Sequence, residues 1–166
     1  MQVSFFEYHL WANKLIYKHL KELPEEVCFQ EIQSVFPTLY DTLFHLYQVD
    51  FVWLGAIKGD PFEKIVEEVN RLKEENLERS LEKLENSYFQ LGNKFREFKN
   101  SLENLDAITT LHHPSFGTLT TSYEELFQHV ANHGTYHRGN ITAMLSQLGY
   151  KGVPTDYIFY LYENQK

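Results

Sequence analysis

The chain has 166 residues, of which 43% are hydrophobic and 16% aromatic, and its formal net charge is −8. This length and hydrophobic content predict a single domain over residues 1–166 with a substantial core. The acidic charge argues against a nucleic-acid partner, because phosphate-binding surfaces need clustered Lys and Arg. The one cysteine, Cys28, excludes an intramolecular disulfide and a cysteine-rich zinc site.

The first residues, MQVSFFEYHLWANK, lack a basic stretch followed by an apolar core, so we expect no signal peptide. No apolar run approaches ~18 residues, so we expect no membrane span. These features predict a soluble, cytoplasmic protein. The aromatic content exceeds what the inside of one such domain needs, which favours a homodimer.

Helical periodicity runs through most of the chain. The first predicted helix covers residues 4–23 and ends before Pro24. The second covers residues 37–58, starts with a proline that a first helical turn tolerates, and ends before the strong stop signal GDP.

The third predicted helix, residues 74–104, has the clearest periodicity. Its apolar residues alternate in steps of four and three, a heptad seam that predicts left-handed packing against neighbouring helices. A free-standing coiled coil would fit this segment alone, but the other amphipathic helices favour a bundle. Residues 61–73 either extend this helix backwards or form a separate turn. The seam consists of Leu77, Leu81, Leu84, Tyr88, Leu91, Phe95, Phe98, Leu102 and Leu105.

Residues 106–122 break the helical pattern and predict a loop or a short strand pair. Ser122 followed by Glu125 is a capping-box signature for a fourth helix, residues 123–148, which Gly149 ends. The segment GVPTDYIFYLYE then predicts a short C-terminal helix. Together these elements predict an all-α fold, an antiparallel four-helix bundle with a short C-terminal helix. Such bundles place metal and ligand sites in their cores.

The fourth helix carries three histidines four residues apart, His129, His133 and His137, in the stretch HVANHGTYHRGNITAML. Side chains at this spacing share one face of a helix, and imidazole suits transition metals at neutral pH. At ~100° per residue, the apolar residues of the helix direct His133 and His137 inward and His129 toward the rim. The HExxH arrangement of metalloproteases is excluded, because the pair lacks the neighbouring Glu.

Two histidines do not close a metal site, so the third ligand should come from another helix. His45 is the leading candidate, because it lies in the middle of the second helix among apolar residues. A lone histidine on an apolar face is more often a hydrogen-bonded core residue. The presence of His133 and His137 favours metal binding by His45 instead.

The run HxxxHxxxHRGN, the upstream histidine and the closing GVPTDYIFYL resemble the DinB/YfiT-like family of small four-helix-bundle metalloproteins. The resemblance covers essentially the whole chain. It implies that His45, His133 and His137 bind a divalent metal ion, with zinc or nickel as the main candidates. The family's HRGQ motif has Gln where this chain has Asn140, which leaves the metal ligands in place and changes the local hydrogen-bond network.

The same resemblance implies a possible metal-dependent thiol S-transferase, because the family includes transferases and isomerases that use bacillithiol, mycothiol or glutathione. Three neutral imidazoles do not compensate the positive charge of the metal ion, and they leave at least one coordination position open to water or substrate. Catalytic zinc sites have this arrangement, whereas structural zinc sites are closed. Three functions stay open for this chain. They are a transferase that joins a low-molecular-weight thiol to a small electrophile, a hydrolase that activates water at the metal, and a non-catalytic metal or small-molecule binding protein.

Supporting roles follow for residues near the histidines. Asp41 could accept the second N–H of His45, or simply favour the first turn of its helix. Arg138 is a candidate for binding the carboxylate of a thiol cofactor, or for an ion pair with an acidic neighbour. Asn140 could orient a metal ligand or bridge two helices.

Other residues are assigned weaker roles. Asp156 and Tyr157 could close the pocket, or cap and pack the last helix. Cys28 is expected to be a spectator. The remaining histidines are expected to be ordinary surface or loop residues. They are His9, His19, His112 and His113, and the last two, which form a pair in the predicted loop, could lie over a pocket.

Overall fold

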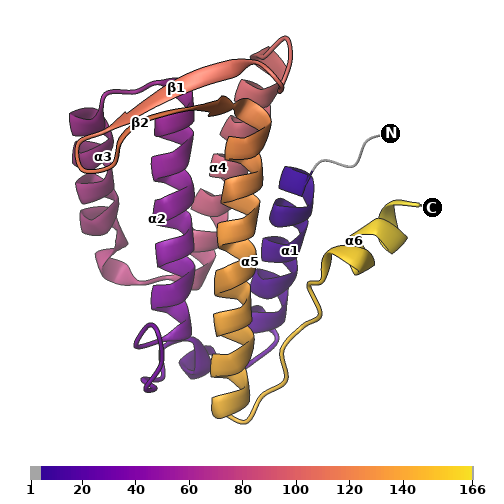
Figure 1. The fold of residues 1–166 in the computed structure, drawn as a ribbon. Coiled ribbons are helices and arrows are strands. Elements are labelled where there is room, and N and C mark those ends of the chain that lie inside the picture. Colours follow the sequence, from indigo (N-terminus) through magenta and orange to yellow (C-terminus); the bar gives the residue numbers. More distant parts are fainter. Residues whose placement is uncertain (1–4, 166) are drawn as a thin grey trace. The chain divides into compact units, whose positions relative to one another are not determined.

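The computed structural model describes residues 5–165, apart from the side chain of Leu77. Six α-helices, two short 3₁₀ helices (η) and one hairpin form the regular structure of this part of the chain (Figure 1), so the predicted all-α fold class is confirmed. None of the described helices is long and apolar enough to cross a lipid bilayer. The elements are α1 (Phe5–Lys21), η1 (Glu25–Cys28), α2 (Leu39–Lys58), α3 (Phe62–Glu75), η2 (Asn76–Glu78), α4 (Leu81–Ser101), β1 (Ile108–His113), β2 (Gly117–Ser122), α5 (Tyr123–Gln147) and α6 (Tyr157–Asn164).

The chain divides into two compact units. The first unit comprises the residues up to Leu46 and those from Val130 onward, and the second comprises Tyr47–His129. Helices α2 and α5 therefore contribute residues to both units. The single domain over residues 1–166 and the homodimer both stay predictions.

In the first unit, aromatic side chains hold the C-terminal helix α6 against α1. The rings of Tyr8 and Tyr160 are both buried, and their centroids lie 5.9 Å apart. The hydroxyl of Tyr8 donates to the backbone carbonyl of Thr155 at 2.9 Å, and the indole N–H of Trp11 donates to the carboxylate of Glu163 at 2.8 Å. Buried aromatic pairs stabilise beyond the area they bury. The predicted C-terminal helix is thus a packed part of this unit.

Helix α2 begins at Leu39, slightly later than the predicted residue 37, because Thr38 caps it. The hydroxyl of Thr38 accepts the backbone N–H of Asp41 at 3.1 Å and donates to the carboxylate of Asp41 at 2.7 Å. This contact satisfies one of the N–H groups that the first turn of a helix leaves without a partner. The cap fixes where α2 begins and therefore which way His45 faces.

The second unit contains the largest departure from the prediction. The single helix expected over residues 74–104 does not exist, because α3 and α4 are separated by η2 and a short turn. Within that turn Arg79 has a left-handed backbone with a φ of 47°, which a right-handed helix cannot continue. Residues 61–73 neither extend α4 nor form a turn. Pro61 precedes the separate helix α3, to which the rest of this segment belongs and whose Ile65 is buried.

The heptad seam is retained inside α4, where its central positions are buried. The predicted position Leu77 precedes α4, and its side chain lies outside the described part of the structure. At the other end Leu102 is extended, with a ψ of 134°, so α4 stops at Ser101 rather than at residue 104. The buried seam residues are Leu84, Tyr88, Leu91 and Phe95.

Residues 106–122 form the strand pair rather than the loop. Strands β1 and β2 run antiparallel and lie side by side in Figure 1, with Leu111 opposite Leu119. Helix α5 then begins at Tyr123 as predicted. The hydroxyl of Ser122 accepts the backbone N–H of Glu125 at 3.3 Å, which is one half of the expected capping box.

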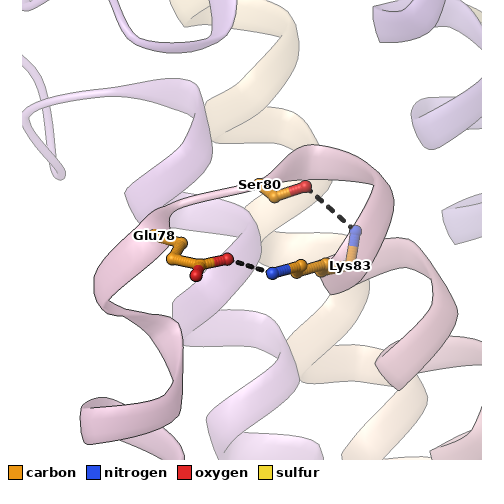
Figure 2. Close-up of polar contacts among 3 residues, drawn as sticks. All are labelled: Glu78, Ser80 and Lys83. Atoms are coloured by element: carbon orange, nitrogen blue, oxygen red, sulfur yellow. Dashed lines mark hydrogen bonds and ion pairs between the residues drawn. The ribbon is translucent and has the colours of Figure 1, made fainter.

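Figure 2 shows how the start of α4 is fixed. The hydroxyl of Ser80 accepts the backbone N–H of Lys83 at 3.3 Å. The ammonium of Lys83 pairs with the carboxylate of Glu78, and this hydrogen bond lowers the pKa of Glu78. Exposed ion pairs of this kind contribute little to stability. The Ser80 cap is therefore the stronger determinant of where α4 begins.

We expect Ser80→Ala to lower the free energy of unfolding by about 1 kcal/mol, because an N–H of the first turn of α4 loses its acceptor. Ser80→Asp should keep most of the stability, since Asp is an equally good cap. The measurement is urea denaturation followed by circular dichroism. Ser146→Ala, at an exposed position inside α5, is the control and should not lower stability, because Ala favours helix. Equal stabilities of Ser80→Ala and the unsubstituted protein would show that the cap does not define α4.

Candidate metal centre

Three histidine side chains converge within the first unit. His45 comes from α2, and His133 and His137 come from successive turns of α5. Each offers one ring nitrogen, and these three nitrogens lie within 4.8 Å of one another. Ligand nitrogens bound at about 2.0–2.1 Å to one tetrahedral ion would stand roughly 3.4 Å apart. The donor atoms and their spacing therefore fit a metal, and the cluster could hold one ion after small side-chain adjustments.

The burial of the histidines on α5 follows the order that the rotational argument predicted. His137 is 5% exposed, whereas His133 is half-buried and His129 is exposed. Val130 and Ile141, which define the inward face of the same helix, are both 0% exposed. The face that carries His133 and His137 is therefore the face that α5 buries.

Two aromatic rings lie against the histidine cluster, and the sequence pattern did not identify either. Phe36, in the connection before α2, has its ring centroid 4.7 Å from that of His45 and 5.7 Å from that of His137. The ring of Tyr136 lies 5.0 Å from that of His137. These contacts restrict the rotation of two imidazoles, those of His45 and His137. The signal available in the sequence was that Phe36 immediately precedes the helix that carries His45.

Asn140 contacts the cluster directly. Its side-chain amide nitrogen lies 3.2 Å from Nδ1 of His137, while Nε2 of His137 lies 3.1 Å from Nε2 of His133. Both ring nitrogens of His137 are therefore within hydrogen-bond distance of a partner. Of the two roles predicted for Asn140, the orientation of a metal ligand has this contact in its favour.

Comparison with known proteins identifies the family. The model of the DinB family matches residues 1–166. The protein named Protein DinB of Bacillus subtilis (strain 168) is 42% identical over 159 residues, which cover 96% of this chain and 92% of that protein. The chain belongs to the DinB family.

Membership of the DinB family confirms the resemblance inferred from the histidine run and the C-terminal segment. It also agrees with the predominantly helical structure. The assignment of His45, His133 and His137 as metal ligands stays a prediction, for which the convergence of their nitrogens is the structural support.

Arg138 follows His137 in the sequence of this DinB-family chain and lies in a buried polar layer of the first unit. The side chain is 2% exposed, and its guanidinium donates to Asn13 at 2.9 Å and to the hydroxyl of Thr135 at 2.8 Å. The guanidinium carbon lies 5.2 Å from the ring centroid of Tyr8, a cation–π distance. These contacts join α1 to α5. The role of Arg138 in binding a cofactor carboxylate stays a prediction.

The prediction that His9 is an ordinary surface histidine is wrong. His9 is 0% exposed, and its two ring nitrogens lie 3.2 Å from the Arg138 guanidinium and 3.2 Å from the Asn13 amide nitrogen. The prediction used the spacing of apolar residues on α1 to find its inward face. That pattern cannot show a helix face that is buried because it packs polar groups against a guanidinium on another helix.

Gly134 allows this close approach of α1 and α5. A Cβ atom at that position would lie 2.2 Å from Nδ1 of His9 and 2.8 Å from the guanidinium of Arg138. Real Cβ atoms do not come this close to other heavy atoms. The glycine therefore lets the polar layer form immediately beside the turn that carries His133.

The structure shows part of the surroundings of the other predicted supporting residues. Burial raises the pKa of the Cys28 thiol to about 11, which fits an inert spectator. Asp156 makes no side-chain cap at the start of α6, and the ring of Tyr157 lies 5.1 Å from that of Tyr8, so this residue packs the last helix. The predicted interaction of Asp41 with His45 stays a prediction. Asp41 takes part in the Thr38 cap described above.

The remaining histidines have local partners. In the second unit, the ring centroid of His129 lies 4.3 Å from that of Trp53. Desolvation lowers the pKa of His129, and the negative charge of Asp50 opposes part of this shift. His19 lies 2.7 Å from a backbone carbonyl, and His112 lies 3.0 Å from the hydroxyl of Thr118. His113, the other member of the predicted loop pair, packs against the ring of Phe62 at 5.3 Å.

We expect Gly134→Ala to destabilise the protein by about 1–3 kcal/mol, because the added methyl group overpacks the contact with His9 and Arg138. Gly139→Ala on the same helix is the matched control, since nothing lies within 4 Å of a Cβ there. This control should raise the free energy of unfolding by about 0.5–1 kcal/mol, because Ala is the better helix former. Urea denaturation of both variants gives the comparison. Equal effects of the two substitutions would contradict the close packing assigned to Gly134.

Proposed function

We propose that this DinB-family protein binds one divalent metal ion, zinc or nickel, through His45, His133 and His137, and transfers a low-molecular-weight thiol to a small electrophile. The observation that supports the proposal best is the convergence of three imidazole nitrogens within 4.8 Å in one unit. Three neutral ligands leave the charge of the ion uncompensated and at least one position open. When bound, such an ion supplies a Lewis acid that favours the deprotonated form of a thiol or of water.

The protein's own residues have distinct tasks in this proposal. The imidazoles hold the ion. Phe36 restricts the rings of His45 and His137, and Tyr136 restricts the ring of His137. Asn140 contacts the Nδ1 atom of His137 on the side away from His133. A metal-bound histidine usually has such a partner for its second nitrogen, which sets the direction of the first.

The thiol must come from outside the protein. Cys28 is the one cysteine of the chain, and its pKa of about 11 leaves it protonated at neutral pH. A small thiol such as bacillithiol would instead lose its proton, form a carbon–sulfur bond with the electrophile, and displace a leaving group that departs with its electron pair. The source of the reacting sulfur distinguishes this proposal from a protein-thiol mechanism.

We expect His45→Ala, His133→Ala and His137→Ala each to lower the metal content sharply, because each removes one of three protein ligands. His129→Ala is the control and should retain most of the metal, since His129 packs against Trp53 in the second unit. Elemental analysis of the four variants, purified in parallel and checked for folding by circular dichroism, gives the metal content per chain. Loss of metal from His129→Ala with retention by His45→Ala would overturn the ligand assignment.

We expect metal-loaded protein to conjugate monochlorobimane with one member of a panel of bacillithiol, mycothiol and glutathione. The reaction should be lost in His45→Ala and retained in Cys28→Ser, because the sulfur is supplied by the small thiol. Fluorescence of the conjugate measures turnover. Hydrolysis of ester substrates without any thiol would instead indicate the metal-dependent hydrolase. Full metal occupancy with no turnover of any substrate would indicate a binding protein.

A further inference from the structure

A cavity of about 260 Å³ lies in the second unit, where helices α2 and α4 provide its walls. Pockets for drug-sized ligands usually have volumes of about 300–1,000 Å³, so this cavity suits a smaller molecule. None of its lining residues is acidic, and none belongs to the candidate metal centre. The lining residues are Tyr47, Phe51, Asn86, Ser87, Gln90, Leu91 and Lys94.

The α4 side of the cavity carries a polar stripe. Asn86, Gln90 and Lys94 are four residues apart, so they share one face of the helix, and all three are exposed. At 1.5 Å per residue, the stripe extends about 12 Å along the helix axis from Asn86 to Lys94. The cavity wall therefore presents two carboxamides and, at one end, an ammonium group.

Lys94 makes the cavity suitable for an anion. Among the residues that the structure describes, no carboxylate pairs with the ammonium of Lys94. The walls of the cavity also contain no acidic side chain. A ligand carboxylate at this end would therefore gain an ion pair without displacing a protein carboxylate, and it would meet no like charge in the lining.

The α2 side of the cavity is aromatic. Tyr47 and Phe51 lie on successive turns of α2, and Tyr47 is only 9% exposed. Burial raises the pKa of Tyr47, a hydrogen bond with Ser87 opposes part of this shift, and the negative charge of Glu75 adds to it. The phenol of Tyr47 is therefore neutral at neutral pH. This side offers aromatic surface for a ring, and the Ser87 end offers neutral hydrogen-bonding groups.

We propose that this cavity binds a small aromatic carboxylate that has a hydroxyl group at its opposite end. The carboxylate pairs with Lys94, the ring packs against Phe51 and Leu91, and the hydroxyl group bonds at the end formed by Ser87. The compound 4-hydroxyphenylacetate has this pattern and serves as the probe. The cavity shares no residue with the histidine cluster, so this inference does not depend on the proposed metal chemistry.

The test is a titration of the protein with 4-hydroxyphenylacetate, followed by ¹H–¹⁵N NMR. EDTA is present so that the carboxylate cannot bind through a metal ion. The side-chain amide signals of Asn86 and Gln90 should shift and saturate, with a Kd on the order of 1 mM for a ligand of this size.

Two related compounds test the chemistry assigned to each end of the cavity. Tyramine has an ammonium in place of the carboxylate and should bind about tenfold more weakly, because attraction to Lys94 becomes repulsion. The net charge of −8 would by itself favour tyramine, so the opposite preference identifies a local effect. Phenylacetate lacks the hydroxyl group and should bind about threefold to tenfold more weakly.

Lys94→Met should weaken binding of 4-hydroxyphenylacetate about fivefold, the upper end of what an exposed ion pair contributes. It should also remove the preference for this probe over tyramine. Lys14→Met is the matched control, because it removes the same charge from an exposed lysine of α1 that does not line the cavity, and it should leave the affinity unchanged. Circular dichroism checks that both variants fold.

Three results would overturn the inference. They are equal affinities of Lys94→Met and Lys14→Met, binding of tyramine as tight as that of 4-hydroxyphenylacetate, and signal shifts that do not include the amides of Asn86 and Gln90. The metal content of Lys94→Met, measured by elemental analysis, should equal that of the unsubstituted protein. Failure of the cavity to bind the probe therefore leaves the proposed function untouched, and loss of metal from the histidine variants leaves the cavity untouched.

Discussion

The candidate centre depends on one constraint, the position of His45 on α2 relative to the two histidines of α5. Imidazoles a single turn apart on one helix provide two ligands, and a third must come from a neighbouring helix. Thr42, which is 0% exposed and lies one turn before His45, donates from its hydroxyl to the sulfur of Met144 on α5 at 3.4 Å. The cap at Thr38 and this contact together fix both the rotation and the height of α2 against α5 within the first unit.

The same segment of α5 is held from a second direction by the polar layer on α1. Successive residues of a helix point about 100° apart, so His137 and its neighbour Arg138 face different partners. Arg138 is stabilised by Asn13, Thr135 and the ring of Tyr8. A buried cation costs free energy unless its hydrogen bonds are satisfied. Loss of one partner would therefore be expected to disturb the turn that carries the histidines, although none of these groups contacts a metal.

Periodicity in the sequence was sufficient to predict most of the helices and the inward face of α5, because both depend on which residues share a helix face. It placed the inward side of α5 correctly, with His137 more buried than His133 and His129 exposed. It failed between α3 and α4, where the break depends on the left-handed backbone of Arg79 and the cap at Ser80. Neither feature alters an apolar repeat. His9 was misplaced for a related reason, since its burial depends on an arginine more than a hundred residues away.

The chemistry that the centre favours follows from what its ligands lack. Three imidazoles carry no negative charge when they coordinate, so a bound divalent ion would keep its full attraction for an anionic ligand. Cys28 is buried and protonated, and therefore does not supply that anion. On the proposed function, the missing charge is brought by the sulfur of a small thiol. Phe36 and Tyr136 place aromatic rings beside two of these imidazoles. The absence of charge among the ligands thus favours an anionic co-substrate rather than a structural role for the ion.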